Sequence, residues 1–123
     1  MAVDPDRMGD GECSKDYIVV YQAPTAPLIN GIPTYTVQVL NTCLGQGCGG
    51  AGGGIAAVHL RCGWFSSARL VNPKVFRRLG FDDCLVNDGR PIPAGGAVSF
   101  QYANTYPYRL SVSSVSCTPP KFP

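Results

Sequence analysis

The chain contains one histidine, one tryptophan and few charged residues, and it has no long hydrophobic run. Only 15% of its 123 residues are charged, and the formal net charge is +2. Proteins that bind nucleic acid usually carry a basic stripe and a higher pI, so this charge argues against nucleic acid as a partner. No apolar run approaches the ~20 residues of a membrane-spanning helix, so we expect no membrane insertion.

Reactive side chains in catalytic patterns are also scarce. His59 is the only histidine and lies in a strand-like pattern, where an ordinary surface histidine is the simplest interpretation. No GxSxG motif indicates a serine hydrolase. The glycine-rich run 45–54 lacks the Gly-Lys-Ser/Thr end of a phosphate-binding loop. We therefore expect a protein that is not an enzyme and holds no cofactor or metal.

The two ends of the chain are expected to lie outside the folded domain. The start lacks the apolar stretch of a signal peptide, so we expect a mature chain with an added Met1. Residues 1–12 are predicted to be a disordered segment, and residues 118–123 a C-terminal tail. Residues 13–117 then form one domain, large enough to bury a core.

Cysteine is the chemically distinctive residue of this chain. There are six of them, and no pair has the CxxC spacing that is typical of zinc sites. They are Cys13, Cys43, Cys48, Cys62, Cys84 and Cys117. Disulfides persist in oxidising compartments, so the chain is predicted to carry three disulfides and to be secreted.

Alternating apolar and polar residues predict a β fold. Residues 17–21 are β-branched and aromatic, and residues 34–39 alternate. The intervening stretch 24–33 is rich in proline and glycine, so we expect an antiparallel pair joined by a loop. Further short strands at similar spacing favour an all-β fold, a small antiparallel β-sandwich. The predicted core includes Val58, Leu60, Phe100, Leu110 and Val112.

One short helix is predicted over residues 73–79. Asn72 is a good N-cap, Pro73 suits the first helical position, and Gly80 suits the residue after the end.

In this helix one face is expected to be apolar and the other cationic. Phe76 and Leu79 would be buried at i, i+3 spacing, Phe81 would fold back on Phe76, and Arg77 and Arg78 would point to solvent. The disulfide pairing is open, because six cysteines allow fifteen arrangements. The best single pair is Cys62 with Cys84, which would close the base of the segment that bears the helix.

Several blocks of the sequence together resemble the tapetum determinant family of secreted plant signalling proteins. The blocks are 13–16, 35–43, 59–67, 72–79, 82–89, 99–104 and 110–117. The run from Cys62 to Gly89 is long and idiosyncratic. The glycine-rich insert after Cys48 is longer than expected for the family and suggests a member from a grass.

This resemblance implies a signalling ligand in the apoplast. Family members resemble extracellular cues that bind the ectodomain of a leucine-rich-repeat receptor kinase, together with a somatic-embryogenesis-type co-receptor. The implied role is to specify the anther tapetum and to limit the number of sporogenous cells.

Aromatic residues and arginine are the usual anchors of protein interfaces, which suggests where the receptor contact lies. We expect it to centre on residues 62–89, with Arg77 and Arg78 as charged anchors. The candidate contact residues are Arg61, Trp64, Phe65, Arg69, Arg77, Arg78, Asp82, Asp83 and Asp88.

Two other classes of function stay open at this point. An expansin-like carbohydrate-binding module would need a plane of exposed aromatic rings, drawn from Trp64, Tyr102, Tyr106 and Tyr108. A small secreted hydrolase would need a cleft in which Asp82, Asp83 or Asp88 faces another acid or His59.

Overall fold

The computed structural model describes residues 14–44 and 54–117. Cys13, Cys48, the glycine-rich run up to Gly53, the predicted disordered segment 1–12 and the predicted tail 118–123 lie outside the described residues. No helix in the described ranges is long and apolar enough to cross a membrane. The strands are β1 (Ile18–Thr25), β2 (Thr34–Asn41), β3 (Gly54–Arg61), β4 (Phe76–Gly80), β5 (Asp83–Val86), β6 (Ile92–Pro93), β7 (Ala97–Ala103) and β8 (Ser111–Ser116).

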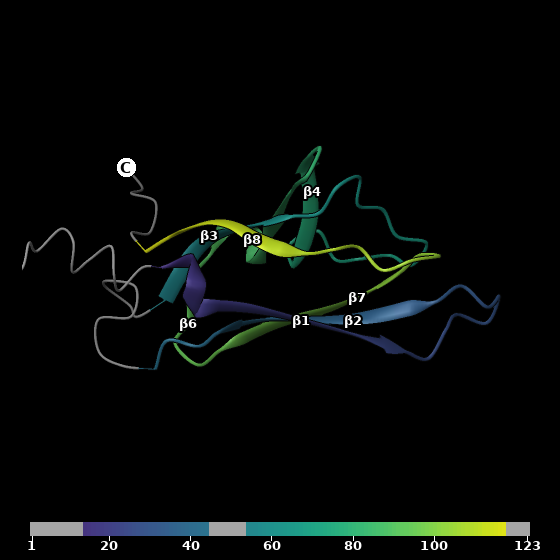
Figure 1. Cartoon of the computed structure of the whole chain (residues 1–123), viewed down its shortest axis with the longest axis horizontal. Helices are drawn as coiled ribbons and strands as arrows, with labels where there is room; N and C mark the ends of the chain where they lie inside the picture. Colours follow the sequence, from purple (N-terminus) through teal and green to yellow (C-terminus); the bar gives the residue numbers. More distant parts are fainter. Residues whose placement is uncertain (1–13, 45–53, 118–123) are drawn as a thin grey trace, which may run out of the picture.

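The strands form two antiparallel sheets, so the predicted all-β fold is confirmed. One sheet has the strand order β1-β2-β7, and the other has the order β4-β5-β3-β6, with β8 also paired to β3. Figure 1 shows the two sheets as two layers. The only helical segments described are two single 3-10 turns, η1 (Lys15–Tyr17) and η2 (Asn87–Gly89).

The inner faces of the two sheets share one hydrophobic core. Val58, Leu60 and Phe100 are buried as predicted, whereas Leu110 and Val112 are partly buried and pack against the core. Aromatic rings form its centre: Phe76 stacks on Phe100 with ring centroids 4.2 Å apart, and Phe65 meets Phe76 edge-on at 4.9 Å. Such ring pairs stabilise a core beyond their buried area, by ~0.5–1.5 kcal/mol each.

The first predicted strand pair is confirmed. Residues of β1 pair with β2 in register from Ile18 opposite Asn41 to Thr25 opposite Thr34. Just before and in the last strand, Leu110 and Val112 alternate with polar residues while Val115 falls one position out of phase, and the pairing of this strand is irregular. Between β3 and β8 the register shifts, since His59 faces Ser114 while Leu60 faces Val112. An extra residue on one strand of a pair is a β-bulge, and it explains why Val115 leaves the alternating pattern.

The predicted helix over residues 73–79 is wrong. Asn72 does start a turn, because its Oδ1 accepts a hydrogen bond from the Lys74 N–H at 3.0 Å. After that turn Phe76–Gly80 is strand β4, paired with β5. A helix of seven residues is marginal in water. Strand pairing satisfies the backbone in the sheet and still buries Phe76, so tertiary context overrides the local signals.

Two details of that helix are wrong for the same reason. Leu79 is 48% exposed rather than buried beside Phe76. Phe81 does not fold back on Phe76 but packs against Trp64, with ring centroids 4.8 Å apart.

The predicted disulfide between Cys62 and Cys84 is confirmed. Its Cα atoms are 6.1 Å apart, and it joins the residue after β3 to the second residue of β5. The segment that it closes carries a strand and turns instead of a helix. Cys43 and Cys117 are also disulfide-bonded. The predicted total of three disulfides depends on Cys13 and Cys48, which are not described.

Removing the Cys62–Cys84 link should cost much of the stability. The double variant Cys62→Ala and Cys84→Ala frees a loop with a sequence separation of 22 residues. Loops of this size correspond to a loss of about 3 kcal/mol or more. Guanidinium unfolding without reductant measures this loss, with Ser114→Ala on the exposed side of β8 as the control. A loss below about 1 kcal/mol would show that sheet pairing alone holds β5 in place.

Candidate functional site

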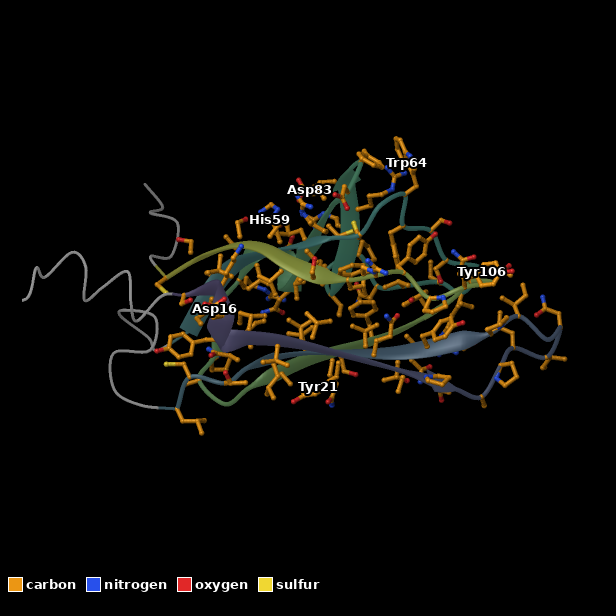
Figure 2. The ribbon with its side chains drawn as sticks, viewed as in Figure 1. Asp16, Tyr21, His59, Trp64, Asp83 and Tyr106 are labelled. Atoms are coloured by element: carbon orange, nitrogen blue, oxygen red, sulfur yellow. A yellow bond between two sulfur atoms is a disulfide. The ribbon has the colours of Figure 1, made fainter. Side chains whose placement is uncertain are left out.

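A solvent-exposed group of two aromatic rings and one guanidinium stands out among the described residues. Trp64 is 65% exposed and Phe81 is 62% exposed, and their rings are in contact. The Cζ atom of Arg78 lies 5.0 Å from the Trp64 ring centroid, a distance at which a guanidinium and an indole attract each other. We call Trp64, Arg78 and Phe81 the Trp64 cluster. Figure 2 shows Trp64 at the outer tip of the layer that contains β4.

Trp64 points outward because its neighbour is fixed in the core. Phe65 is 8% exposed and contacts Phe76, Tyr102 and Tyr108. The Phe65 carbonyl also accepts a hydrogen bond from Arg78 Nε at 3.2 Å. Phe65, a candidate receptor contact, is therefore the buried anchor of the loop, and the adjacent Trp64 presents the exposed surface.

Hydrogen bonds of Asp82 connect the two turns that carry the aromatic rings. Asp82 Oδ1 accepts hydrogen bonds from the backbone N–H groups of Cys62 and Gly63, at 3.0 and 2.8 Å. The Asp82 N–H donates to the Gly63 carbonyl at 2.7 Å. Both Gly63 and Asp82 have positive φ angles, 55° and 58°, which glycine adopts freely and aspartate tolerates better than most residues. Asp82 thus holds Trp64 and Phe81 side by side.

The Tyr108 hydroxyl provides a second set of hydrogen bonds to the loop that carries Trp64. Its hydroxyl accepts hydrogen bonds from Asn104 Nδ2 at 2.6 Å and from the Ser66 N–H at 3.1 Å. The same hydroxyl donates to the Trp64 carbonyl at 3.3 Å. The loop that carries Trp64 is therefore tied to the segment before β8.

Tyr102 lies beneath this loop and keeps its proton. Its side chain is fully buried in the core, its hydroxyl donates to Gln22 Oε1, and it accepts from the Tyr108 N–H at 2.8 Å. Burial raises the pKa of Tyr102 to about 12. The Tyr102 hydroxyl therefore stays a hydrogen-bond donor at any physiological pH.

Arg77 and Arg78 are adjacent in the sequence but differ in their surroundings. Arg77 Nη1 forms an ion pair with Asp88 at 2.7 Å and donates to the Pro73 carbonyl at 3.1 Å. The hydrogen bond from Arg77 holds the pKa of the Asp88 carboxyl below its usual value. Arg77 is thus engaged within the chain, whereas Arg78 belongs to the Trp64 cluster.

Asp83 and His59 meet on the outer side of the five-stranded sheet. His59 Nδ1 lies 2.7 Å from Asp83 Oδ1, and Figure 2 shows both side chains on that surface. Their side chains are 28% and 45% exposed. Catalytic electrostatics are strong where water is excluded, and this pair is open to water, so the acid–histidine contact gives little support to the hydrolase hypothesis.

The remaining candidate arginines lie apart from the cluster. Arg61 is exposed at the end of β3. Arg69 lines a surface hollow of about 200 Å³ with Val75, Phe100 and Gln101, beside β7.

Phe81 is the member of the cluster that the sequence interpretation missed as a contact residue. The signal was present, because Gly80-Phe81-Asp82 is a turn sequence between two possible strands. The predicted helix assigned Phe81 to a buried helix end instead.

The rings named for carbohydrate binding do not form one exposed platform. Tyr102 is buried and Tyr108 is half-buried, which leaves Trp64 and Tyr106 as the exposed rings of the four.

Replacing Asp82 should loosen the cluster. Asp82→Ala leaves the N–H groups of Cys62 and Gly63 without their acceptor, which should cost about 1–3 kcal/mol. Asp82→Asn keeps an oxygen acceptor and tolerates a positive φ, so it should restore most of the loss. Denaturant unfolding gives the stability. Near-UV circular dichroism reports the packing of Trp64, the single tryptophan. Equal stability and equal spectra for wild type and both variants would contradict the role of Asp82.

Comparison with known proteins gives a consistent family assignment. The family model described as tapetum determinant 1, C-terminal, matches residues 14–118. The chain is 56% identical over 111 residues to TPD1 protein homolog 1A of Oryza sativa subsp. japonica, a match that covers 90% of this chain and 49% of that protein. It is 54% identical over 123 residues to TPD1 protein homolog 1 of Arabidopsis thaliana, covering 95% of this chain and 65% of the relative.

A third relative is TPD1 protein homolog 1B of Oryza sativa subsp. japonica, 44% identical over 90% of this chain and 62% of the relative. No solved structure matches the chain significantly. The chain spans about half to two thirds of the length of these curated relatives. Since the family model covers nearly the whole described region, the chain belongs to the tapetum determinant family.

Proposed function

We propose that the chain is a secreted signalling ligand that binds the ectodomain of a leucine-rich-repeat receptor kinase in the apoplast. In the anther this binding specifies tapetum fate and limits the number of sporogenous cells, with a somatic-embryogenesis-type co-receptor in the complex. Membership of a family named for the tapetum supports the developmental role. The observation that carries receptor binding is the Trp64 cluster, two exposed rings and an arginine on a disulfide-fixed scaffold.

The composition of the cluster matches that of an interface hot spot. Tryptophan and arginine dominate the residues whose truncation weakens protein complexes most. Trp64 and Phe81 expose most of their surface to water, so their burial against a partner is favourable.

Pre-organisation adds to this advantage. The Asp82 hydrogen bonds and the Cys62–Cys84 disulfide hold the cluster before the partner arrives. Little conformational entropy is then lost on docking, and more of the interaction energy appears as affinity.

The partner surface should combine an apolar pocket with a carboxylate. Arg78 donates a hydrogen bond from Nε to the Phe65 carbonyl, and among residues 14–44 and 54–117 no acceptor binds its two Nη groups. A guanidinium fork with free N–H groups suits a receptor carboxylate. The concave face of a leucine-rich-repeat solenoid offers a broad surface for such a contact. Arg77, expected to be a second anchor, has less to contribute because Asp88 already pairs with it.

Carbohydrate binding by an expansin-like module is the weaker proposal, because Tyr102, one of the rings that it needs on the surface, is buried in the core.

Single substitutions on β4 and in the neighbouring loop test the receptor site. Trp64→Ala and Arg78→Ala should each weaken binding by about 2 kcal/mol or more, which is about thirtyfold. Arg78→Lys should also bind poorly, since lysine lacks the planar fork. Arg77→Ala, a matched arginine one position away, should change the affinity less than about threefold. The folded variants are titrated against an immobilised anther leucine-rich-repeat receptor ectodomain.

The possible outcomes distinguish a failure of the proposed function from a failure of the proposed binding site. A folded wild-type chain that fails to bind any such ectodomain contradicts the proposed function. Wild-type affinity for Trp64→Ala and Arg78→Ala leaves receptor binding intact and moves the contact away from the Trp64 cluster.

A further inference from the structure

None of the residues in β1, β2 and β7 is charged. These three strands make up one whole sheet, and its outer surface faces away from the core. The outer surface of the other sheet is different, because it carries His59, Arg61, Arg77 and Asp83. One layer of the molecule therefore presents an outer surface with charged residues, and the other presents an outer surface without them.

The strand register shows which side chains form the outer surface of the uncharged sheet. Successive residues of a strand point to opposite faces, and Val37 and Val39 are buried in the core. The alternate positions thus form cross-strand rows on the outside. The rows are Val19–Leu40–Ala97, Tyr21–Gln38–Ser99 and Ala23–Thr36–Gln101, which we call the neutral face.

Tyr21 lies in the central row of the neutral face. It is 57% exposed, and Figure 2 shows its side chain pointing away from the other layer. The face has one internal side-chain bond, from Gln101 Nε2 to Thr36 Oγ1 at 3.1 Å. Depletion of charged residues is a compositional feature that distinguishes the centre of a protein interface from the rest of a surface, and the neutral face has none.

The edge strands of this sheet carry no charged side chain, although a loop covers the end of β7, where the Ala68 N–H donates to the Ala103 carbonyl and the Ala103 N–H donates to Ser67 Oγ. β1 and β7 are its two edge strands. Natural sheets commonly block association with charged side chains, lysine above all, on edge strands, and neither β1 nor β7 has one. Pro24 in β1 removes one backbone donor from that edge, which favours association through the face over strand addition at β1.

We propose that the neutral face is a homodimer interface, on which two copies of the chain pack sheet against sheet about a two-fold axis. A two-fold axis brings the same patch of both copies together, so a charged residue near the centre of the patch would face its like across the interface. The neutral face carries no charged residue, and Arg69 lines the hollow beside its Ser99 and Gln101. A surface without charge also offers nothing to select an oppositely charged partner. A two-fold axis uses the same patch on both copies, and such dimers are the commonest oligomers.

The size of the face sets the strength of the dimer. Strands lie ~4.8 Å apart and rise ~3.4 Å per residue, so three strands of this length have a footprint of about 350 Å². Side-chain relief makes the accessible area larger, and two copies bury on the order of 1,000 Å², near the lower limit for a specific interface. The dimer is therefore reversible. It also leaves both Trp64 clusters free, because Trp64 lies on the other layer.

Sedimentation equilibrium on the full chain tests the dimer. For the wild-type chain at about 1 to 200 µM, the average mass should rise with concentration from the chain mass of 13.0 kDa toward twice that mass. Gln38→Lys places a charge at the centre of the face on both copies and should weaken the dimer at least about tenfold. Ser114→Lys adds the same charge to the exposed side of β8 and should leave the dimer unchanged. Far-UV circular dichroism verifies that each variant is folded.

Two results would overturn the proposal. One is a wild-type chain that stays monomeric throughout, whether or not it then binds a neutral wall glucan through Tyr21. The other is a dimer that Ser114→Lys weakens as much as Gln38→Lys does. Receptor binding by the Trp64 cluster is measured separately and does not depend on either result.

Discussion

The covalent attachment of β5 to the end of β3 is the constraint on which the exposed site depends. Cys62 and Cys84 are almost fully buried, and their bond fixes where the chain leaves one strand and where it enters the other. Asp82 lies between these points and binds the backbone N–H groups of Cys62 and Gly63. With both turns held, Trp64 and Phe81 meet although 17 positions separate them in the sequence.

The arrangement of charge divides the molecule into two functional sides. One sheet bears ion pairs on its outer face and the Trp64 cluster at its tip, while the other sheet has no charged residue at all. Charged groups give selectivity for an oppositely charged partner, and a neutral face allows contact between identical chains. The proposed dimer contact and the proposed receptor contact would therefore use opposite layers of the molecule.

Arg77 and Arg78 illustrate how backbone conformation assigns roles to identical side chains. A helix would have placed both guanidinium groups toward solvent on one side. In strand β4 neighbouring residues point to opposite faces, so Arg77 meets Asp88 and Arg78 meets Trp64. The choice between the two conformations was made by pairing with β5, a partner that the local sequence does not reveal.

Residue patterns alone predicted the β fold, the first strand pair, the Cys62–Cys84 disulfide and the family resemblance, and they show the break in alternation near Val115. These features follow from the alternation of apolar and polar residues, the cysteine content and short sequence blocks, all of which are local or compositional. Residue patterns did not reveal that residues 76–80 form a strand, that Phe65 is buried while Trp64 is exposed, or that Phe81 completes the cluster. The physical reason is that each of these outcomes depends on contacts between segments far apart in the chain, whose energies exceed the small preferences of the local sequence.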